Sequence, residues 1–131
     1  AKSLGIEKQV KFYGKVQRNI AQDIMAKADC FIMVSSHEAF GLVYLEAMGK
    51  GLIPIGTKGQ GIDGVIINGE NGFLCPSDDV DALSNIINKI CSLDSNQRQN
   101  ISDKAIQTAE SLTDIKAAQL YINALESVIK E

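Results

Sequence analysis

The sequence predicts an α/β fold, a three-layer sandwich in which helices cover both faces of a parallel sheet and further helices end the chain. Short apolar runs typical of strands alternate with segments whose apolar residues recur at helical spacing, which is the pattern of parallel sheets. Nine of the 11 glycines lie between Gly41 and Gly72, mostly after predicted strands, where open α/β sheets bind ligands.

The composition is that of one soluble globular domain spanning residues 1–131. No apolar run is longer than a strand, so the sequence predicts no membrane span. A net charge of -3 without clustered Lys or Arg argues against a nucleic-acid-binding protein. Three cysteines without C-x-x-C spacing and a single His exclude a zinc site and favour a reducing cytoplasm.

The first 35 residues are predicted to contain the end of a helix, a strand, a helix and a second strand. Ala1–Leu4 followed by Gly5 is typical of a last helical turn with a glycine cap, so we expect a longer polypeptide upstream. β-branched and aromatic residues predict a strand over 10–16, and apolar residues at helical spacing predict a helix over 19–28. The continuous apolar run 30–35 predicts a strand that is covered on both faces.

The rest of the chain continues the alternation and then becomes helical. Residues 40–51 are predicted to form a helix that ends at glycine, followed by strands over 52–57 and 72–77. Three apolar stripes then predict three helices, which contain residues 83–90, 101–112 and 115–129. Thr113 or Asp114 is predicted to cap the last of these helices.

One glycine cluster is similar to a nicotinamide-dinucleotide fingerprint. Gly59–Gly64 reads G-x-G-x-x-G after a predicted strand, and Asp79 stands 20 residues after Gly59. That fingerprint opens a helix, but only VIINGEN, which contains turn signals, separates Gly64 from Gly72. A nicotinamide-dependent dehydrogenase is therefore our third choice of function, and the sequence contains no P-loop motif.

The stretch EAFGLVYLE, which begins at Glu38, predicts a site for an anion flanked by neutral groups. The turn Phe40-Gly41-Leu42 joins a buried strand to a helix, so the first helical amides can bind phosphate, and Gly41 allows close approach. Glu38 and Glu46 would be repelled by phosphate and are expected to accept hydrogen bonds from hydroxyls beside it. This combination describes a nucleotide sugar; the alternative is that Glu46 is a solvated surface acid.

Residues 29–90 resemble the group-1 glycosyltransferases, a family of retaining enzymes with the GT-B fold. The shared pattern includes an E-x7-E element at Glu38 and Glu46, the FGL turn, the EAM that follows it and the NGENGFL segment. The weaker F-x-G of KFYGKV extends the resemblance upstream. In that family the segment belongs to the second, Rossmann-like domain, so the resemblance implies the C-terminal, donor-binding half of a GT-B fold.

The resemblance also implies roles for individual residues. Glu38 would contact the donor hexose and is the candidate catalytic residue, whereas Glu46 would bind the ribose. The first amides after Glu38 would meet the diphosphate or the sugar, and they belong to Phe40, Gly41 and Leu42. Further candidates for nucleotide contacts are Lys15 and Gln17 near the base and Lys58 near the diphosphate.

The sequence departs from the family pattern at several positions. Val34 stands where the family has Pro, Ala39 stands where it has Gly, and GQGIDGV, with Asp63 as its nearest acid, replaces G-G-x-x-E. His37, next to Glu38, is interpreted as a loop residue because the family position is variable. The family's basic pair for the diphosphate and its acceptor-binding domain have no counterpart in these residues.

We therefore expect the donor-binding domain of a retaining hexosyltransferase that uses a nucleoside-diphosphate sugar and needs no cofactor or metal. An N-terminal domain outside these residues would bind the acceptor, and nucleic acid would not be a partner. The enzyme would act in polysaccharide or glycolipid biosynthesis, in the cytoplasm and at the cytoplasmic face of the membrane. These residues alone should fold but transfer no sugar. The alternative is a non-catalytic nucleotide-sugar-binding or scaffolding module of the same fold.

Overall fold

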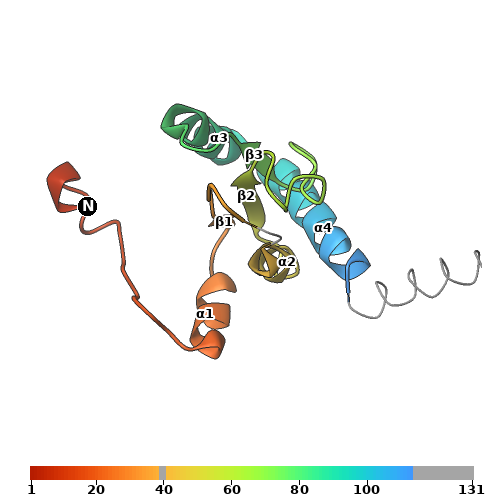
Figure 1. Cartoon of the computed structure of the whole chain (residues 1–131), viewed down its shortest axis with the longest axis horizontal. Helices are drawn as coiled ribbons and strands as arrows, with labels where there is room; N and C mark the ends of the chain where they lie inside the picture. Colours follow the sequence, from red (N-terminus) through yellow and green to blue (C-terminus); the bar gives the residue numbers. More distant parts are fainter. Residues whose placement is uncertain (39–40, 114–131) are drawn as a thin grey trace, which may run out of the picture.

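The computed structural model of the chain describes residues 1–38 and 41–113, and its centre is a sheet of parallel strands (Figure 1). The strands are β1 (Cys30–Ile32), β2 (Ile53–Thr57) and β3 (Phe73–Cys75), in this order across the sheet. β2 pairs in parallel with both neighbours, with Cys30 opposite Ile53 in the first pair. The predicted parallel sheet is therefore confirmed, and the three strands end at the same edge.

Helices precede and follow these strands. In the described residues they are η1 (Lys2–Leu4), α1 (Arg18–Met25), α2 (Leu42–Met48), α3 (Val80–Ser92) and α4 (Ser95–Ser111). The short 3₁₀ turn η1 ends at Gly5, as predicted. α1 to α4 confirm the helices predicted over 19–28 and 40–51 and the first two of the three predicted after the last strand. The helix predicted over 115–129 lies outside the described residues, and so does Asp114, one of its two candidate caps.

Side chains at the starts of α3 and α4 satisfy helix amides that have no partner within the helix. Asp79 Oδ1 accepts a hydrogen bond of 2.8 Å from the amide of Ala82. Asp94 and Gln97 form a reciprocal capping box, with hydrogen bonds of 2.8 and 3.0 Å. Asp79 therefore caps α3 and is not the acid of a dinucleotide fingerprint, and no described helix begins between Gly64 and α3.

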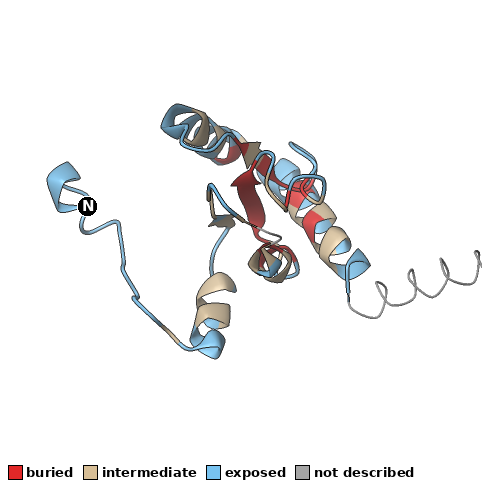
Figure 2. Cartoon of the chain, in the orientation of Figure 1, coloured by how far each residue is buried: buried red, intermediate tan, exposed pale blue. Residues whose placement is uncertain are grey.

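The hydrophobic core lies on both faces of β2, which is buried at every position (Figure 2). On one face the sheet packs against α3 and α4, through Ile53, Ile55, Phe73, Cys75, Ile90 and Ile101. On the other face the buried residues are Tyr44 of α2 and Ile62 and Ile66 of the glycine-rich segment between β2 and β3. This arrangement gives the predicted three layers, with the glycine-rich segment completing the layer that α2 begins.

The prediction of a strand over residues 10–16 is wrong. These residues belong to no strand, and Phe12 is 82% exposed. Figure 1 shows this segment extended and separate from the sheet. Aromatic and β-branched residues favour a strand only where another strand is available to pair with them. None of the described strands pairs with these residues, so their composition alone does not produce a strand.

The strand predicted over 30–35 forms, but it is shorter and more exposed than expected. β1 covers only Cys30–Ile32, and Ile32 is 44% exposed. In the described part of the chain β1 lies at the edge of the sheet and pairs with β2 alone. Cys30 packs against the core cluster on one face of the sheet and Phe31 against the cluster on the other, so the predicted cover on both faces is present, but it is incomplete at Ile32.

Asn71, within the NGENGFL segment, joins the glycine-rich segment to α4. Its Oδ1 accepts a hydrogen bond from the Ile67 amide at 2.7 Å, and its Nδ2 donates to the Val65 carbonyl at 3.0 Å and to Thr108 Oγ1 at 2.9 Å. Because the carboxamide is buried, its removal leaves the Ile67 amide and the Val65 carbonyl without this partner, whereas Thr108 Oγ1 still donates to the Lys104 carbonyl at 2.8 Å. We expect Asn71→Ala to lower the free energy of unfolding by about 2–3 kcal/mol, measured by urea denaturation.

Asn68→Ala provides the matched control for this experiment. Asn68 Oδ1 accepts a single hydrogen bond of 3.0 Å, from the amide of Leu74, at an exposed position. Water can replace that bond, so we expect this variant to lose only about 0.5–1 kcal/mol. Equal losses in the two variants would contradict the idea that the buried amide network holds the segment against α4.

Candidate functional site

The predicted site lies at the edge of the sheet where the parallel strands end, which is where open α/β sheets bind ligands. The loop after β1 carries Glu38, and the loop after β2 carries Gln60 and Gly61. The amide of Glu38 donates to Gln60 Oε1 at 3.0 Å, and the amide of Gly61 donates to the Glu38 carbonyl at 3.2 Å. The main chain of Glu38 is therefore held in place by the neighbouring loop.

The glycine-rich loop from Gly59 to Gly64 has its own internal bond. Its acid, Asp63, accepts a hydrogen bond of 2.6 Å from the amide of Gly59 through Oδ2. The main chain of Asp63 also forms an isolated β-bridge with that of Ile66. The carboxylate thus closes the loop, and the closed loop presents Gln60 to Glu38. This support is the structural role of a loop whose sequence departs from the family pattern.

Tyr44 connects α2 to the end of β1 and was not singled out from the sequence. It is completely buried, its hydroxyl donates to the carbonyl of Met33, and its ring packs edge-on against Phe31 with centroids 5.4 Å apart. Burial raises the pKa of the Tyr44 hydroxyl above its ordinary value, and the negative charge of Glu38 raises it further. Glu38 lies beside the start of α2, because a Cβ added at Gly41 would be 3.3 Å from Cγ of Glu38.

Gly41 is the N-cap residue of α2, and its position requires the absence of a side chain. It has φ 70°, in the left-handed region, and an added Cβ would lie 2.6 Å from Cδ2 of Tyr44. The group that lies against Gly41 in the structure is the ring of Tyr44, and the close approach of a ligand to this glycine stays a prediction. Leu42 follows as the first residue of α2 and is exposed, whereas Phe40 lies outside the described residues.

Glu46 has two partners on a different helix. Its Oε1 forms an ion pair with Arg18 of α1, and its Oε2 accepts a hydrogen bond of 2.7 Å from Nε2 of Gln22, one turn further along α1. The side chain of Glu46 is 30% exposed, whereas that of Arg18 is 80% exposed. Glu46 is therefore not a free solvated acid. The sequence contained no signal for either partner.

The remaining predicted contacts lie at the surface. Lys15, Gln17 and Lys58 are all exposed. Gln17 precedes α1 without capping it through its side chain, and the Lys58 amide donates to the Cys75 carbonyl at 2.9 Å. His37 is an exposed loop residue, as interpreted from the sequence. No contact in the described residues joins the lysines or Gln17 to Glu38 or Glu46, so their predicted roles stay predictions.

Comparison with known proteins identifies the family to which this arrangement belongs. The sequence profile described as "Glycosyl transferases group 1" matches residues 1–108 of the chain. This chain belongs to the group 1 glycosyltransferases. The resemblance drawn from the E-x7-E element and the NGENGFL segment is thereby confirmed.

Individual glycosyltransferases match over almost the whole chain. N-acetyl-alpha-D-glucosaminyl L-malate synthase of Bacillus anthracis is 33% identical over 131 residues, which cover 99% of this chain and 34% of the synthase. The structure of HepE from Anabaena in complex with UDP and glucose matches with a TM-score of 0.81 and 31% identity, over 96% of this chain and 34% of HepE. The chain thus spans about a third of the length of each of these proteins.

A shorter protein gives the same fold. The C-terminal domain of the group 1 glycosyltransferase LpcC from Francisella tularensis matches with a TM-score of 0.77 and 27% identity, over 85% of this chain and 57% of that domain. With the match to HepE, this confirms the predicted α/β, Rossmann-like fold of GT-B glycosyltransferases.

Two hydroxyls at the edge of the sheet where the strands end were missed by the sequence analysis. Ser35 follows β1 and Thr57 ends β2, and the hydroxyl oxygens of both are buried without a hydrogen-bond partner among the described residues. A buried hydroxyl without a partner destabilises a protein unless a ligand or water satisfies it. The position of both residues at the carboxyl ends of strands was the available signal.

Thr57→Val tests whether the unpaired hydroxyl lowers the stability of the protein when no ligand is bound. Thr57 is only 1% exposed, so the substitution removes an unpaired hydroxyl while keeping a β-branched side chain in the core. We expect the free energy of unfolding to rise by about 1 kcal/mol, measured by urea denaturation without ligand. Ile55→Val, which removes one methylene from the same strand, is the control and should lower stability by about 1 kcal/mol. A loss of stability in Thr57→Val would show that the hydroxyl has a partner.

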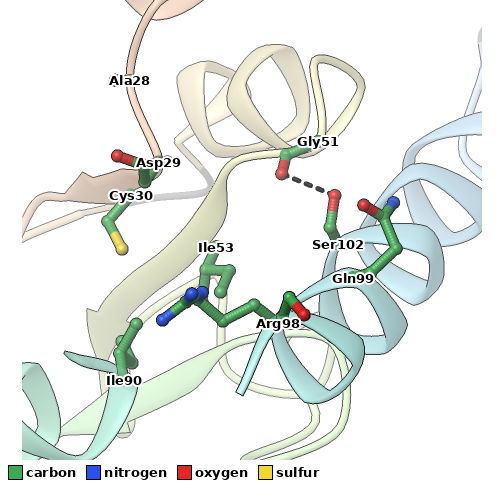
Figure 3. Close-up of a pocket in the computed structure, with 10 residues that line it drawn as sticks. Ala28, Asp29, Cys30, Gly51, Ile53, Ile90, Arg98, Gln99 and Ser102 are labelled. Carbon is green, nitrogen blue, oxygen red and sulfur yellow. Dashed lines mark hydrogen bonds between the residues drawn. The ribbon is translucent and has the colours of Figure 1, made fainter. Parts of the chain in front are cut away.

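A cavity of about 320 Å³ opens at the opposite edge of the sheet, beside the amino ends of β1 and β2 (Figure 3). Its lining includes Asp29, Cys30, Arg98 and Ser102, and Ser102 Oγ donates to the Gly51 carbonyl at 2.7 Å. Burial raises the pKa of the Cys30 thiol, and the charge of Asp29 raises it further. This cavity is separate from the predicted donor site.

Two further findings concern metals and membranes. In residues 1–38 and 41–113, no three His, Cys, Asp or Glu side chains gather in a way that could hold a metal ion. Transfer without a metal or cofactor stays a prediction. None of the helices in the same residues is both long and apolar enough to cross a membrane.

Proposed function

We propose that this chain is the donor-binding domain of a longer, retaining glycosyltransferase that transfers a hexose from a nucleoside-diphosphate sugar. The observation that carries the proposal is the placement of the E-x7-E acids around α2, with Glu38 before the helix and Glu46 within it, beside the ligand edge of the sheet. One structure of the related HepE contains UDP-glucose and another contains UDP. These complexes support a nucleoside diphosphate as the ligand.

Each part of this site has a chemical role in the proposal. Glu46 accepts hydrogen bonds from the ribose hydroxyls, because a carboxylate is a stronger acceptor than a neutral oxygen. The first amides of α2, at Leu42 and Val43, face the diphosphate, since the opening amides of a helix have no carbonyl partner within it. Glu38 accepts a hydrogen bond from a hexose hydroxyl. The transferred sugar lies between Glu38 and the start of α2.

The catalytic contribution of this domain is to stabilise the leaving diphosphate. Negative charge increases on the diphosphate as the bond to the hexose breaks, and preorganised donors stabilise that charge most effectively. α2 has only seven residues, so its dipole alone supplies little stabilisation. We therefore assign the cationic side chains that neutralise the diphosphate to the part of the enzyme outside this chain. We assign the acceptor site to the same part. We place that enzyme in the cytoplasm, at the membrane surface where its acceptor is a lipid.

Titration of the labelled chain with UDP and GDP tests the proposal. Without additional cations the complex should be weak, with a dissociation constant of roughly 1 mM, or about −4 kcal/mol. We expect the largest NMR shifts at the amides of Gly41 and Leu42. Absence of shifts with both nucleotides would contradict nucleotide-sugar binding, and shifts centred on Gly59–Gly64 with NAD would instead favour a dehydrogenase.

A turnover assay on the whole protein separates an enzyme from a binding module. An enzyme should consume a nucleoside-diphosphate sugar that it binds, whereas this chain alone should bind the donor without transferring the hexose. Binding without turnover in the whole protein, with every acceptor tried, would favour the non-catalytic module of the same fold. Transfer by the isolated chain would contradict the proposed division of the enzyme into two domains.

A further inference from the structure

The two side chains of α1 that hold Glu46 have no role in the function proposed above. Arg18 contacts Oε1 and Gln22 contacts Oε2, so each carboxylate oxygen has one donor from α1. The donors are 28 and 24 residues away from Glu46 in the sequence. They reach it from a separate helix, so the orientation of the carboxylate depends on where α1 lies.

These contacts do little for the stability of the fold. Arg18 is at the first position of α1 and is 80% exposed, and exposed ion pairs contribute little because water and salt screen them. α1 itself has no fully buried residue. The two contacts stabilise the fold only slightly, but they restrain both oxygens of one carboxylate. This combination suggests that they orient Glu46 for binding a ligand.

The geometry leaves Glu46 able to bind a further group. A carboxylate has about four lone-pair positions, two on each oxygen, and the two donors from α1 occupy one on each. One position on each oxygen is therefore left for two neighbouring hydroxyls. Holding the carboxylate before the ligand arrives reduces the side-chain entropy lost on binding.

We propose that Arg18 and Gln22 are positioning residues, which hold the carboxylate of Glu46 in the orientation that accepts the 2′ and 3′ hydroxyls of the nucleotide ribose. This inference rests on the proposed function, because it assumes that Glu46 meets the ribose. Gln22 fixes Oε2 through one hydrogen bond of 2.7 Å, and Arg18 fixes Oε1 with a charged donor. Neither residue touches the nucleotide in this arrangement.

The test compares a nucleotide with the same nucleotide without ribose hydroxyls. In the whole protein, the tighter of UDP and GDP is titrated by calorimetry together with its 2′,3′-dideoxy analogue. We expect Arg18→Ala and Gln22→Met each to weaken the ribonucleotide by about tenfold and the dideoxy analogue by less than about twofold. Arg18→Lys keeps the charge but not the guanidinium geometry, and it should recover part of the loss.

Two variants on α4 control for the chemistry of these substitutions. Gln99 donates to Asp103 Oδ1 at 2.8 Å, so Gln99→Met removes an equivalent bond from amide to carboxylate away from the site. Arg98→Ala removes an arginine that lines the cavity at the opposite edge of the sheet. Both controls should leave the affinity for ribonucleotide and dideoxy analogue unchanged, and melting temperatures confirm that all variants are folded.

The possible results separate this inference from the function on which it rests. Ribonucleotide affinities equal to those of the unaltered protein would overturn the inference, and so would equal losses for the ribonucleotide and its dideoxy analogue, which indicate a general structural effect. Tighter ribonucleotide binding by Arg18→Ala would also overturn it, since Arg18 would then compete with the ribose. If the unaltered protein binds neither UDP nor GDP, the proposed function fails, and the inference fails with it.

Discussion

Gly41→Ala is expected to lower the free energy of unfolding by about 2–5 kcal/mol and to abolish detectable nucleotide binding. The left-handed backbone at φ 70° costs an L residue roughly 1–2 kcal/mol. The added methyl would lie 2.6 Å from Cδ2 and 2.8 Å from Cε2 of Tyr44, and relief of this overlap costs about 1–3 kcal/mol more. Because Tyr44 is completely buried and bonded to Met33, its ring has nowhere to move without loosening α2. Urea denaturation and UDP titration measure the two effects.

Gly59→Ala is the matched control for the backbone component of this loss. Gly59 also has a left-handed backbone, with φ 77°, but an added Cβ would meet no atom within 4 Å. We expect a loss of about 1–2 kcal/mol from backbone strain alone. The difference between the two variants then measures the overlap with Tyr44. If Gly41→Ala were no more destabilising than Gly59→Ala, the close packing of Gly41 on that ring would be disproved.

Glu46→Gln in the whole enzyme is expected to weaken UDP or GDP by about ten- to a hundredfold, with or without an attached sugar. The amide keeps the shape and one acceptor oxygen but loses charge-assisted hydrogen bonds worth roughly 1.5–3 kcal/mol. It also loses the ion pair with Arg18, which contributes little to the stability of the fold because Arg18 is exposed. The domain should stay folded. Calorimetric titration of the variant with each nucleotide gives the affinity.

Glu38→Gln is the partner experiment and should give the opposite pattern. Its proposed ligand is the hexose, so the affinity for the bare nucleotide should not change, whereas turnover of the intact donor should fall. The main-chain bonds of Glu38 with Gln60 and Gly61 do not involve the substituted atoms, so the loop should keep its conformation. Equal nucleotide affinity for wild type and Glu46→Gln would remove the ribose assignment. A changed affinity only in Glu38→Gln would reverse the two roles.

Most elements of the fold could be predicted from local pattern. α3 and α4 follow apolar stripes at helical spacing and begin at side chains that cap their amides, Asp79 and Asp94. β2 follows a short apolar run and is buried at every position. The segment 10–16 was predicted as a strand for the same local reasons, but β-propensity requires a pairing partner, and no strand of the described residues pairs with it.

The candidate site could be located from the sequence but not described. The E-x7-E spacing and the turn at Gly41 indicated the loop and helix on which the site is proposed, because a helix start after a strand has a known direction relative to the sheet. Neither Thr57 nor Tyr44 was identified as part of this edge. Both are ordinary β-branched or aromatic residues in apolar runs, and only their burial at the ends of elements distinguishes them.

By itself, the sequence determined the α/β class, the family and the two acids, since periodicity, capping residues and motif spacing all act over a few neighbouring positions. Only the tertiary structure decided what those acids touch. Glu46 meets Arg18 and Gln22 across 28 and 24 residues, and Glu38 meets Gln60 across 22. These contacts depend on how separate elements pack against one sheet. The packing comes from burial of apolar surface, which has no direction and therefore leaves no local pattern that pairs one polar side chain with another.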